Sequence, residues 1–364
     1  MIRQIRAALS IALAMSLLND PPHSSACTGI TLRPRDASVI YARTLEFAAD
    51  LKSNLIVVPR GQQFTGTTPS GKPGLRWTTK YACTGMNAFD LPLFIDGLND
   101  RGLAVGLFYF PGYAEYQKTS AADNARTLAP QELGAYLLGT CASVAEVASA
   151  VHEVIVAAVP FAQLGEVPPC HYLVSDAEGN SLVVEYVAGE LRLHDNPLGV
   201  ITNSPTFDWH LTNLSNYVNL SVTNVPPLDV AGTQFRGFGQ GTGMLGLPGD
   251  FTPPSRFVRA VAFAKSALPV DTARDGVLQA FHILNQFDIP KGAARGIEQG
   301  RAVADYTLWT SAADLTNRRY YFRTFDNSRI RMLDLQATDA DAPEITTIDI
   351  AGDEDIEYVT PTVK

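Results

Sequence analysis

Cysteine, clustered basic residues and long apolar runs are all scarce in this sequence. It has 4 cysteines in 364 residues, and no CxxC or HxxxH spacing joins them or its 6 histidines, so no metal site is expected. Asp and Glu outnumber Lys and Arg by 37 to 28, and no basic cluster interrupts this acidic balance, which argues against a nucleic-acid surface. The apolar run of the N-terminal segment is far short of the roughly 20 residues of a membrane-spanning helix, and no later stretch is long and apolar enough. We therefore expect no metal, other cofactor, nucleic acid or stable membrane insertion.

The overall composition is that of a globular chain. Hydrophobic residues make up 46% of the sequence and charged residues 18%. No internal repeat or flexible linker divides it, and its length is compatible with one large sheet-based domain. We expect a single domain over residues 27–364, with an acidic tail from Ala337 that contains a candidate edge strand over Ile345–Ile350.

The first segment has the three parts of a secretory signal peptide. Two arginines precede an apolar run from Ala7 to Leu18, and a polar stretch then ends at Ala26. We expect residues 1–26 to be removed on export to the periplasm or the medium. Cleavage after Ala26 would make Cys27 the N-terminal residue.

An N-terminal Cys27 would carry both a thiol and an α-amine, which together are a nucleophile and its base. Two other interpretations compete. The four cysteines, Cys27, Cys83, Cys141 and Cys170, allow three disulfide pairings, and exported chains tolerate disulfides. Cys27 could also be a lipid-anchored cysteine, although Ser24 stands where lipoproteins have an aliphatic residue. Position alone leaves all three interpretations open.

Alternation of apolar and polar residues predicts several groups of strands. TGITLRP, SVIYARTLEF and NLIVVPRG predict three short strands directly after Cys27, and residues 91–113 predict two more that join at Asn99–Gly102. A meander of strands is expected over residues 171–205, and two long strands around residues 306–335.

Helices are expected in two places between these strands. One pair begins after Pro130 and over Val144–Ala158, and a second pair covers Ser255–Leu268 and Arg274–Phe287 beyond a loop-rich region. Strands and helices therefore come in groups without regular alternation. This order favours an α+β fold of antiparallel sheets covered by helices over a doubly wound parallel sheet.

Five segments carry a family resemblance. They are CTGITL, YARTLEFAADLKSNLIVVPRG, DGLNDRGLAVGLFYFPGY, GVITNSPTFDWHLTNLSNY and GLPGDFTPPSRFVRA. In this order they resemble the choloylglycine hydrolase family, which contains bile salt hydrolases and penicillin V acylases, and they span essentially the whole chain after residue 26. The run TNSPTFDWHLTNL with PGDF and SRFVRA is the most specific part. The resemblance implies an N-terminal nucleophile (Ntn) hydrolase with an αββα four-layer sandwich of two antiparallel sheets flanked by helices.

The resemblance also implies roles for the residues near Cys27. Cys27 would attack an amide carbonyl, and Arg43 would lie beside the thiolate, whose formation a cation favours. Glu46 stands where much of the family has Asp, the acceptor that orients the α-amine. Either Glu46 makes the same hydrogen bond, or Asp50 in the same segment contributes. Without the resemblance, Arg43 would be a solvent-facing strand residue and Glu46 an ordinary strand-end carboxylate.

Three later residues complete the implied site. Asn203 matches a side-chain donor to the oxyanion, and Tyr109 matches the position whose backbone N–H is the second donor; each donor contributes roughly 3–4 kcal/mol. Arg256 matches an arginine that stabilises the site electrostatically. On their own, Tyr109 would be interpreted as a packing residue and Arg256 as a solvated helix residue.

The expected activity is hydrolysis of a linear, non-peptide amide through a thioester on Cys27. Penicillin V, conjugated bile salts and N-acyl homoserine lactones are all compatible with the resemblance, and the aromatic Tyr109 favours an aromatic acyl group. The resemblance further implies a homotetramer. The alternative from another class is a lipid-anchored or disulfide-linked periplasmic binding protein without catalysis.

Three further motifs are interpreted as non-catalytic. Gly241, Gly243 and Gly246 spell GxGxxG, but no strand clearly precedes them, so a loop is expected. Cys170 and His171 are adjacent and would point to opposite sides of a strand, which argues against a metal pair. Asp208-Trp209-His210 lacks the GxSxG nucleophile of a serine triad, so we expect these residues to serve packing.

Overall fold

The computed structural model describes residues 26–298 and 301–359. The expected signal peptide lies outside this range except for its last residue, Ala26. Within the described residues, every helix is too short or too polar to cross a membrane.

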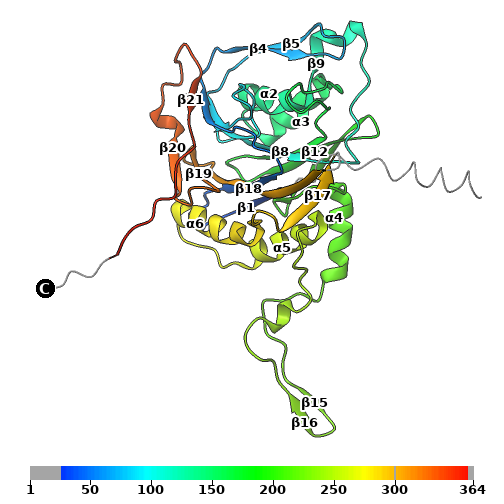
Figure 1. Ribbon diagram of the computed structural model, residues 1–364, viewed down its shortest axis with the longest axis vertical. Helices are drawn as coiled ribbons and strands as arrows, with labels where there is room; N and C mark the ends of the chain where they lie inside the picture. The colour runs from blue at the N-terminus through cyan, green and yellow to red at the C-terminus, as the bar shows by residue number, and fades with distance from the viewer. Residues whose placement is uncertain (1–25, 299–300, 360–364) are drawn as a thin grey trace, which may run out of the picture.

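Two antiparallel sheets form the middle of the molecule (Figure 1). The first has seven strands in the order β14-β1-β2-β18-β19-β20, with β17 paired to β18. Their bounds are β14 (Val200–Ile201), β1 (Thr28–Leu32), β2 (Ile40–Phe47), β18 (Arg301–Asp314), β19 (Arg319–Thr324), β20 (Arg331–Asp334) and β17 (Ala294–Glu298). Cys27 lies directly before β1, next to the centre of this sheet.

The second sheet has eight strands in the order β13-β12-β11-β8-β7-β6-β3-β21. Their bounds are β13 (Glu190–Asp195), β12 (Ser181–Val187), β11 (Cys170–Ser175), β8 (Ala104–Tyr109), β7 (Asp96–Asn99), β6 (Cys83–Met86), β3 (Leu55–Val58) and β21 (Thr346–Ile348). β21 pairs with β3 at the edge, which confirms the edge strand expected in the acidic tail.

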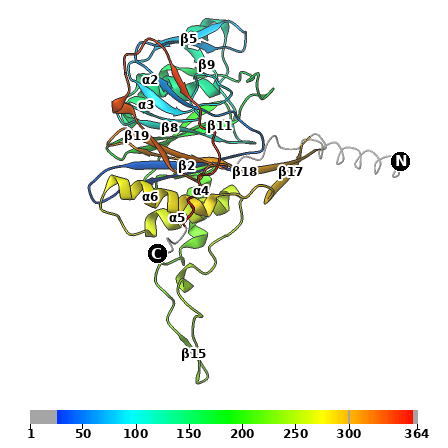
Figure 2. The same ribbon diagram turned by 60° about the vertical axis from the view of Figure 1, so that its left-hand side comes forward.

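Helices cover the outer face of each sheet, as Figures 1 and 2 show. α2 (Leu133–Thr140) and α3 (Val144–Glu153) pack on the eight-stranded sheet, and α5 (Pro253–Ser266) and α6 (Ala273–Leu284) on the seven-stranded sheet. In α6 the apolar residues recur at helical spacing, so that Val277, Phe281 and Leu284 are all buried on one face. The order helix, sheet, sheet, helix confirms the predicted αββα sandwich.

A buried carboxylate joins the two sheets. Asp96 on β7 accepts hydrogen bonds from the hydroxyls of Tyr41 at 2.6 Å, Tyr320 at 2.6 Å and Ser311 at 2.7 Å, all three on the seven-stranded sheet. The hydroxyl of Tyr41 also approaches the backbone of β8 at Gly106, where a Cβ would lie 2.0 Å from it. The close contact between the layers therefore requires glycine at this position.

Several predicted elements end differently in the structure. The helix expected over Val144–Ala158 stops at Glu153, because Ile155–Val156 forms β10 and pairs with β9 (Thr127–Leu128). The region of residues 306–335 contains three strands, not two. The predicted strands also omitted the hairpin of β4 (Gln63–Thr67) and β5 (Pro73–Thr78), which is largely exposed and lacks a clear apolar alternation.

The loop-rich region also contains structure that was not expected. It begins with α4 (Phe207–Asn213) and includes the hairpin of β15 (Leu228–Val230) and β16 (Thr233–Phe235). Short 3-10 turns complete the element list: Ala121–Arg126, Pro130–Glu132, Leu214–Tyr217, Thr242–Met244, Asn285–Phe287 and Leu335–Ala337.

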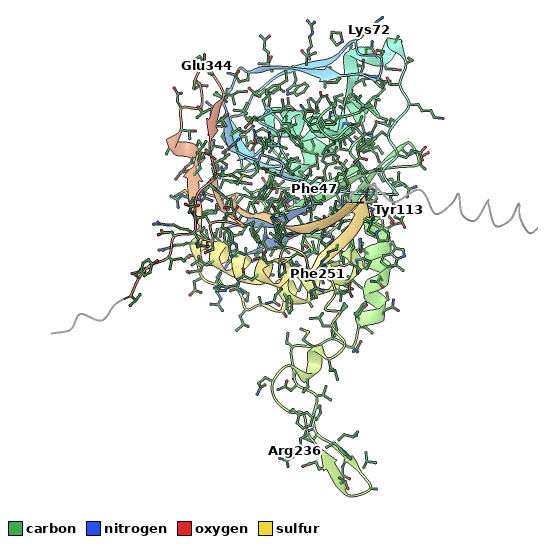
Figure 3. All side chains as sticks on the ribbon, in the orientation of Figure 1. Phe47, Lys72, Tyr113, Arg236, Phe251 and Glu344 are labelled. Carbon is green, nitrogen blue, oxygen red and sulfur yellow. The ribbon has the colours of Figure 1, made fainter. Side chains whose placement is uncertain are left out.

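We call residues 218–246 the arm, because they extend away from the sandwich in Figures 1 and 2. Figure 3 places Arg236 near its tip, whereas Phe47 lies inside the sandwich. The arm exposes many apolar side chains, including Val218, Leu228, Val230, Phe235, Phe238 and Leu245. The GxGxxG glycines belong to the arm, which agrees with the loop expected there.

Candidate active site

The pairing of β1 assembles the site around Cys27. Gly29 of β1 lies opposite Arg43 of β2 on one side and Ile201 of β14 on the other. The residues that follow β14, Thr202 and Asn203, therefore lie beside the start of β1. Cys27 is only 1% exposed, and its backbone N–H donates to Asn203 Oδ1 at 2.8 Å.

Asn203 and Arg256 converge on the backbone of Cys27. Asn203 Oδ1 also accepts a hydrogen bond from Arg256 Nη2 at 2.6 Å, and Arg256 Nη1 donates to the carbonyl of Cys27 and to Thr28 Oγ1. Burial lowers the pKa of Arg256 to about 10, so the guanidinium is charged at neutral pH. Two residues that are distant in sequence thus fix the position of Cys27.

Tyr109 also reaches this cluster. Its backbone carbonyl accepts a hydrogen bond from Asn203 Nδ2 at 2.8 Å, which brings the two expected oxyanion residues together. Its ring packs edge-on against Phe47, and its hydroxyl donates to the carboxylate of Glu166. The packing role and the site position of Tyr109 therefore coexist.

Arg43 is fully buried beneath Cys27. Its Nη1 donates to the carbonyls of Leu107 at 2.5 Å and Ile95 at 3.1 Å, and its guanidinium lies 4.0 Å from the centre of the Phe108 ring. Burial opposes the charge, but the interaction with Cys27, ahead of that with Tyr41, raises the pKa of Arg43. A permanent cation therefore lies close to the thiol.

Glu46 lies in the same interior, on β2. It is opposite Thr307 of β18, whose hydroxyl donates to Glu46 Oε1 at 2.8 Å. Burial raises the pKa of Glu46 to about 8, although Arg256 and Arg43 act in the opposite direction. Asp50, the alternative acid, is exposed and accepts a hydrogen bond from the backbone of Lys52. Glu46 is thus buried and Asp50 faces solvent, and which of them orients the α-amine stays a prediction.

A small apolar cavity of about 50 Å³ lies beside Cys27. Its walls include Leu45, Phe47, Phe89, Phe161, Leu164 and Pro168. Pockets that enclose a drug-sized ligand have volumes of about 300–1,000 Å³. The cavity in this structure is thus apolar but closed.

Cys170 and His171, which the sequence analysis interpreted as non-catalytic, make different contacts in the structure. Cys170 packs with the layer of α2 and α3, while His171 contacts Glu185, so the two do point apart. No His, Cys, Asp and Glu cluster suited to a metal occurs within the described ranges. All four cysteines lie in those ranges, and no disulfide links them.

His210 is the residue whose contact was missed. We interpreted Asp208-Trp209-His210 as packing residues, and the His210 ring does stack on Phe257. Its Nε2, however, lies 2.9 Å from the backbone carbonyl of Asn203. The available signal was its place in the specific run TNSPTFDWH, seven residues after Asn203.

Known proteins resemble this chain over nearly its whole length. The bile salt hydrolase/transferase of Clostridium perfringens is 35% identical over 325 residues, which cover 88% of this chain and 96% of that protein. The penicillin V acylase of Pectobacterium atrosepticum is 27% identical over 350 residues, covering 90% and 84% of the two chains.

Solved structures show the same fold. A variant of the conjugated bile acid hydrolase from Clostridium perfringens superimposes with a TM-score of 0.82 at 32% identity, covering 92% of this chain and all of the other. The family model for linear amide C–N hydrolases, choloylglycine hydrolase family, matches residues 27–348. The chain is an amidohydrolase, which disfavours the non-catalytic binding protein. It belongs to the choloylglycine hydrolase family of linear amide C–N hydrolases.

Proposed function

We propose that this chain acts through Cys27 after cleavage behind Ala26, on the outer side of the cytoplasmic membrane. The observation that carries this proposal is the convergence of Asn203 and Arg256 on Cys27, with the cation of Arg43 beside it. The family match, which starts at residue 27, supports the same boundary. While Ala26 is attached, the Cys27 nitrogen is a peptide N–H and cannot act as a base.

Cleavage behind Ala26 frees the α-amine of Cys27, which then serves as the base. An α-amine has an ordinary pKa of about 7.7–8, so near neutrality it can take the thiol proton of Cys27. The thiolate attacks the amide carbonyl, and the oxyanion receives hydrogen bonds from Asn203 Nδ2 and the backbone N–H of Tyr109. The tetrahedral intermediate expels the amine, which leaves with a proton from the α-ammonium. Water, deprotonated by the α-amine, then hydrolyses the thioester.

We propose an apolar acyl group as the part of the substrate that is recognised. The cavity beside Cys27 has almost entirely apolar walls with several aromatic rings. A large acyl group enters only if this cavity widens, and we propose that the segment of residues 160–168, which Tyr109 holds through a hydrogen bond to Glu166, moves outward. Conjugated bile salts, penicillin V and N-acyl homoserine lactones all place an apolar acyl group next to the amide.

A panel of these three substrates, assayed with purified protein that starts at Cys27, tests the proposal. We expect release of the amine from at least one of them, and loss of turnover in Cys27→Ala and Cys27→Ser with the circular dichroism spectrum unchanged. Full activity in Cys27→Ala would overturn the proposal.

We further propose that the arm mediates self-association into a homotetramer. Val218 is 84% exposed, and Phe235 and Phe238 are exposed as well, on a segment that packs little against its own sandwich. Exposed apolar side chains that gather on one projecting segment fit a protein–protein interface.

A further inference from the structure

Two histidines hold the backbone of the Asn203 segment. His171 Nε2 lies 3.1 Å from the carbonyl oxygen of Thr202, and His210 Nε2 lies 2.9 Å from the carbonyl oxygen of Asn203. A carbonyl oxygen only accepts hydrogen bonds, so Nε2 is the donor in both cases. Two consecutive peptide groups are therefore bound by imidazoles from two different elements, β11 and α4.

Glu185 on β12 connects these elements. Its Oε1 lies 3.2 Å from His171 Nδ1 and accepts a hydrogen bond of 2.9 Å from the backbone N–H of Phe207, the first residue of α4. His171 and Glu185 are both almost completely buried. One carboxylate thus orients the histidine that binds Thr202 and the start of the helix that carries His210.

The surroundings of Glu185, His171 and His210 set the charge of the carboxylate and the contacts of the two rings. Donors around Glu185 hold its pKa near 2 despite burial, so the carboxylate is ionised. His171 then faces an acceptor at each ring nitrogen, Glu185 at Nδ1 and the Thr202 carbonyl at Nε2. Its ring also stacks on Phe110, with the centroids 4.4 Å apart. Burial lowers the pKa of His210 to about 4, so that ring is neutral.

We propose that Glu185 and His171 are positioning residues that hold Asn203 where its side chain can stabilise the oxyanion. Asn203 has no long-range backbone partner in a regular ladder, because β14 ends at Ile201. The carbonyl contacts to His171 and His210 replace that ladder. This inference rests on the proposed function, since it assumes that Asn203 acts on the oxyanion.

Several charged and titratable groups surround Glu185 and His171. His194 on β13 is the one partly exposed member among those described, with its Nε2 at 3.5 Å from Glu185 Oε2 and its side chain 22% exposed. Asp208 and Arg192 face His194, and Arg256 lies near His210. The nearby carboxylate of Glu185 raises the pKa of His194. His171 itself is almost completely buried.

Glu185→Gln tests the proposal, because it keeps the shape and an acceptor for Phe207 but removes the ion pair with His171. We expect kcat to fall at least about tenfold with KM little changed, within the roughly 10²–10³-fold cost of losing one oxyanion donor completely. The matched control is Asp176→Asn. Asp176 is a buried carboxylate directly after β11 that accepts backbone hydrogen bonds from Val144, Glu178 and Asn180, away from Asn203. We expect it to lower the melting temperature and to leave kcat unchanged.

A second pair of variants covers the case in which Glu185→Gln does not fold. His171→Phe keeps the stacking on Phe110 but has no donor for Thr202, whereas His171→Gln offers an amide N–H. We expect His171→Phe to lose kcat and His171→Gln to recover part of it. In the unaltered protein, ¹⁵N NMR at pH 7 should show a proton on Nε2 of His171, the donor to Thr202, and an Nε2 without a proton would overturn the proposal.

Asn203→Ala separates this inference from the proposed function. If Asn203→Ala keeps its activity, the proposed role of Asn203 is wrong. If Asn203→Ala is inactive while folded Glu185→Gln and His171→Phe keep wild-type kcat, the positioning role alone is wrong.

Discussion

At the scale of single residues, Glu46 combines burial, two neighbouring arginines and a raised pKa. Because burial raises its pKa from 4.5 to about 8, the folded state binds the Glu46 proton more tightly than the unfolded state. The resulting stability is complete below about pH 4.5 and is lost as the pH rises to about 8. The loss of stability is at most about 1.4 kcal/mol for each pH unit between the unfolded and the folded pKa of Glu46.

We therefore predict that Glu46→Gln flattens the pH dependence of stability. The free energy of unfolding, measured by urea denaturation between pH 5 and 8, should fall more steeply in the wild type, by up to about 4 kcal/mol. Asp50→Asn, which removes an exposed acid from the same segment, should keep the wild-type slope. Parallel slopes for wild type and Glu46→Gln would show that Glu46 is ionised in the folded protein.

Residues of the site differ in how far the sequence could predict them. Asn203 and Arg256 stand in specific runs of letters, and Cys27 follows the expected cleavage site, so the family resemblance identifies them without a structure. The positioning role of Glu185 has no such signal, because it depends on contacts with His171 on β11 and Phe207 on α4. Long-range contacts of this kind arise only when the sheet register is known.

At the scale of elements, Asp96 connects the two sheets through three hydrogen bonds. Its three hydroxyl partners come from β2, β18 and β19, and all are buried. Removing the carboxylate leaves these hydroxyls without an acceptor, and each unsatisfied buried polar group costs about 1–3 kcal/mol.

We predict that Asp96→Ala destabilises the protein by at least about 3 kcal/mol, as measured by chemical denaturation. Asp271→Ala is the control, because its ion pair with Arg35 is exposed and such pairs contribute about 0–1 kcal/mol. Equal effects of the two substitutions would contradict the role of Asp96 as a link between the sheets.

Elements with clear periodicity could be predicted, and those without it could not. The alternation of β1 to β3 and the helical spacing of α6 were sufficient, because these elements pack against a large core. The helix at Val144 was predicted too long, since its last apolar residues are as suitable for β10 as for a helix. The hairpin of the arm has both faces exposed, so its residues show no such pattern.

At the scale of the whole molecule, the arm is the part that the sandwich does not explain. If it mediates assembly, charges at its apolar tip should separate the subunits. We predict that the double substitution Phe235→Glu and Phe238→Glu converts a tetramer to monomers, as measured by light scattering after gel filtration. Lys72→Glu, on the opposite end of the molecule in Figure 3, should leave the mass unchanged. A wild-type monomer, or a double variant that stays tetrameric, would contradict this role.

Cys27 lies in the main core of the sandwich, and the proposed mechanism makes the chain active only after Ala26 has been removed. The most direct test of this account is mass spectrometry of enzyme quenched during turnover of its best substrate. We predict an acyl adduct on a peptide that begins at Cys27, with a free α-amine. An adduct on another residue, or an active enzyme in which Ala26 is still attached to Cys27, would contradict the account.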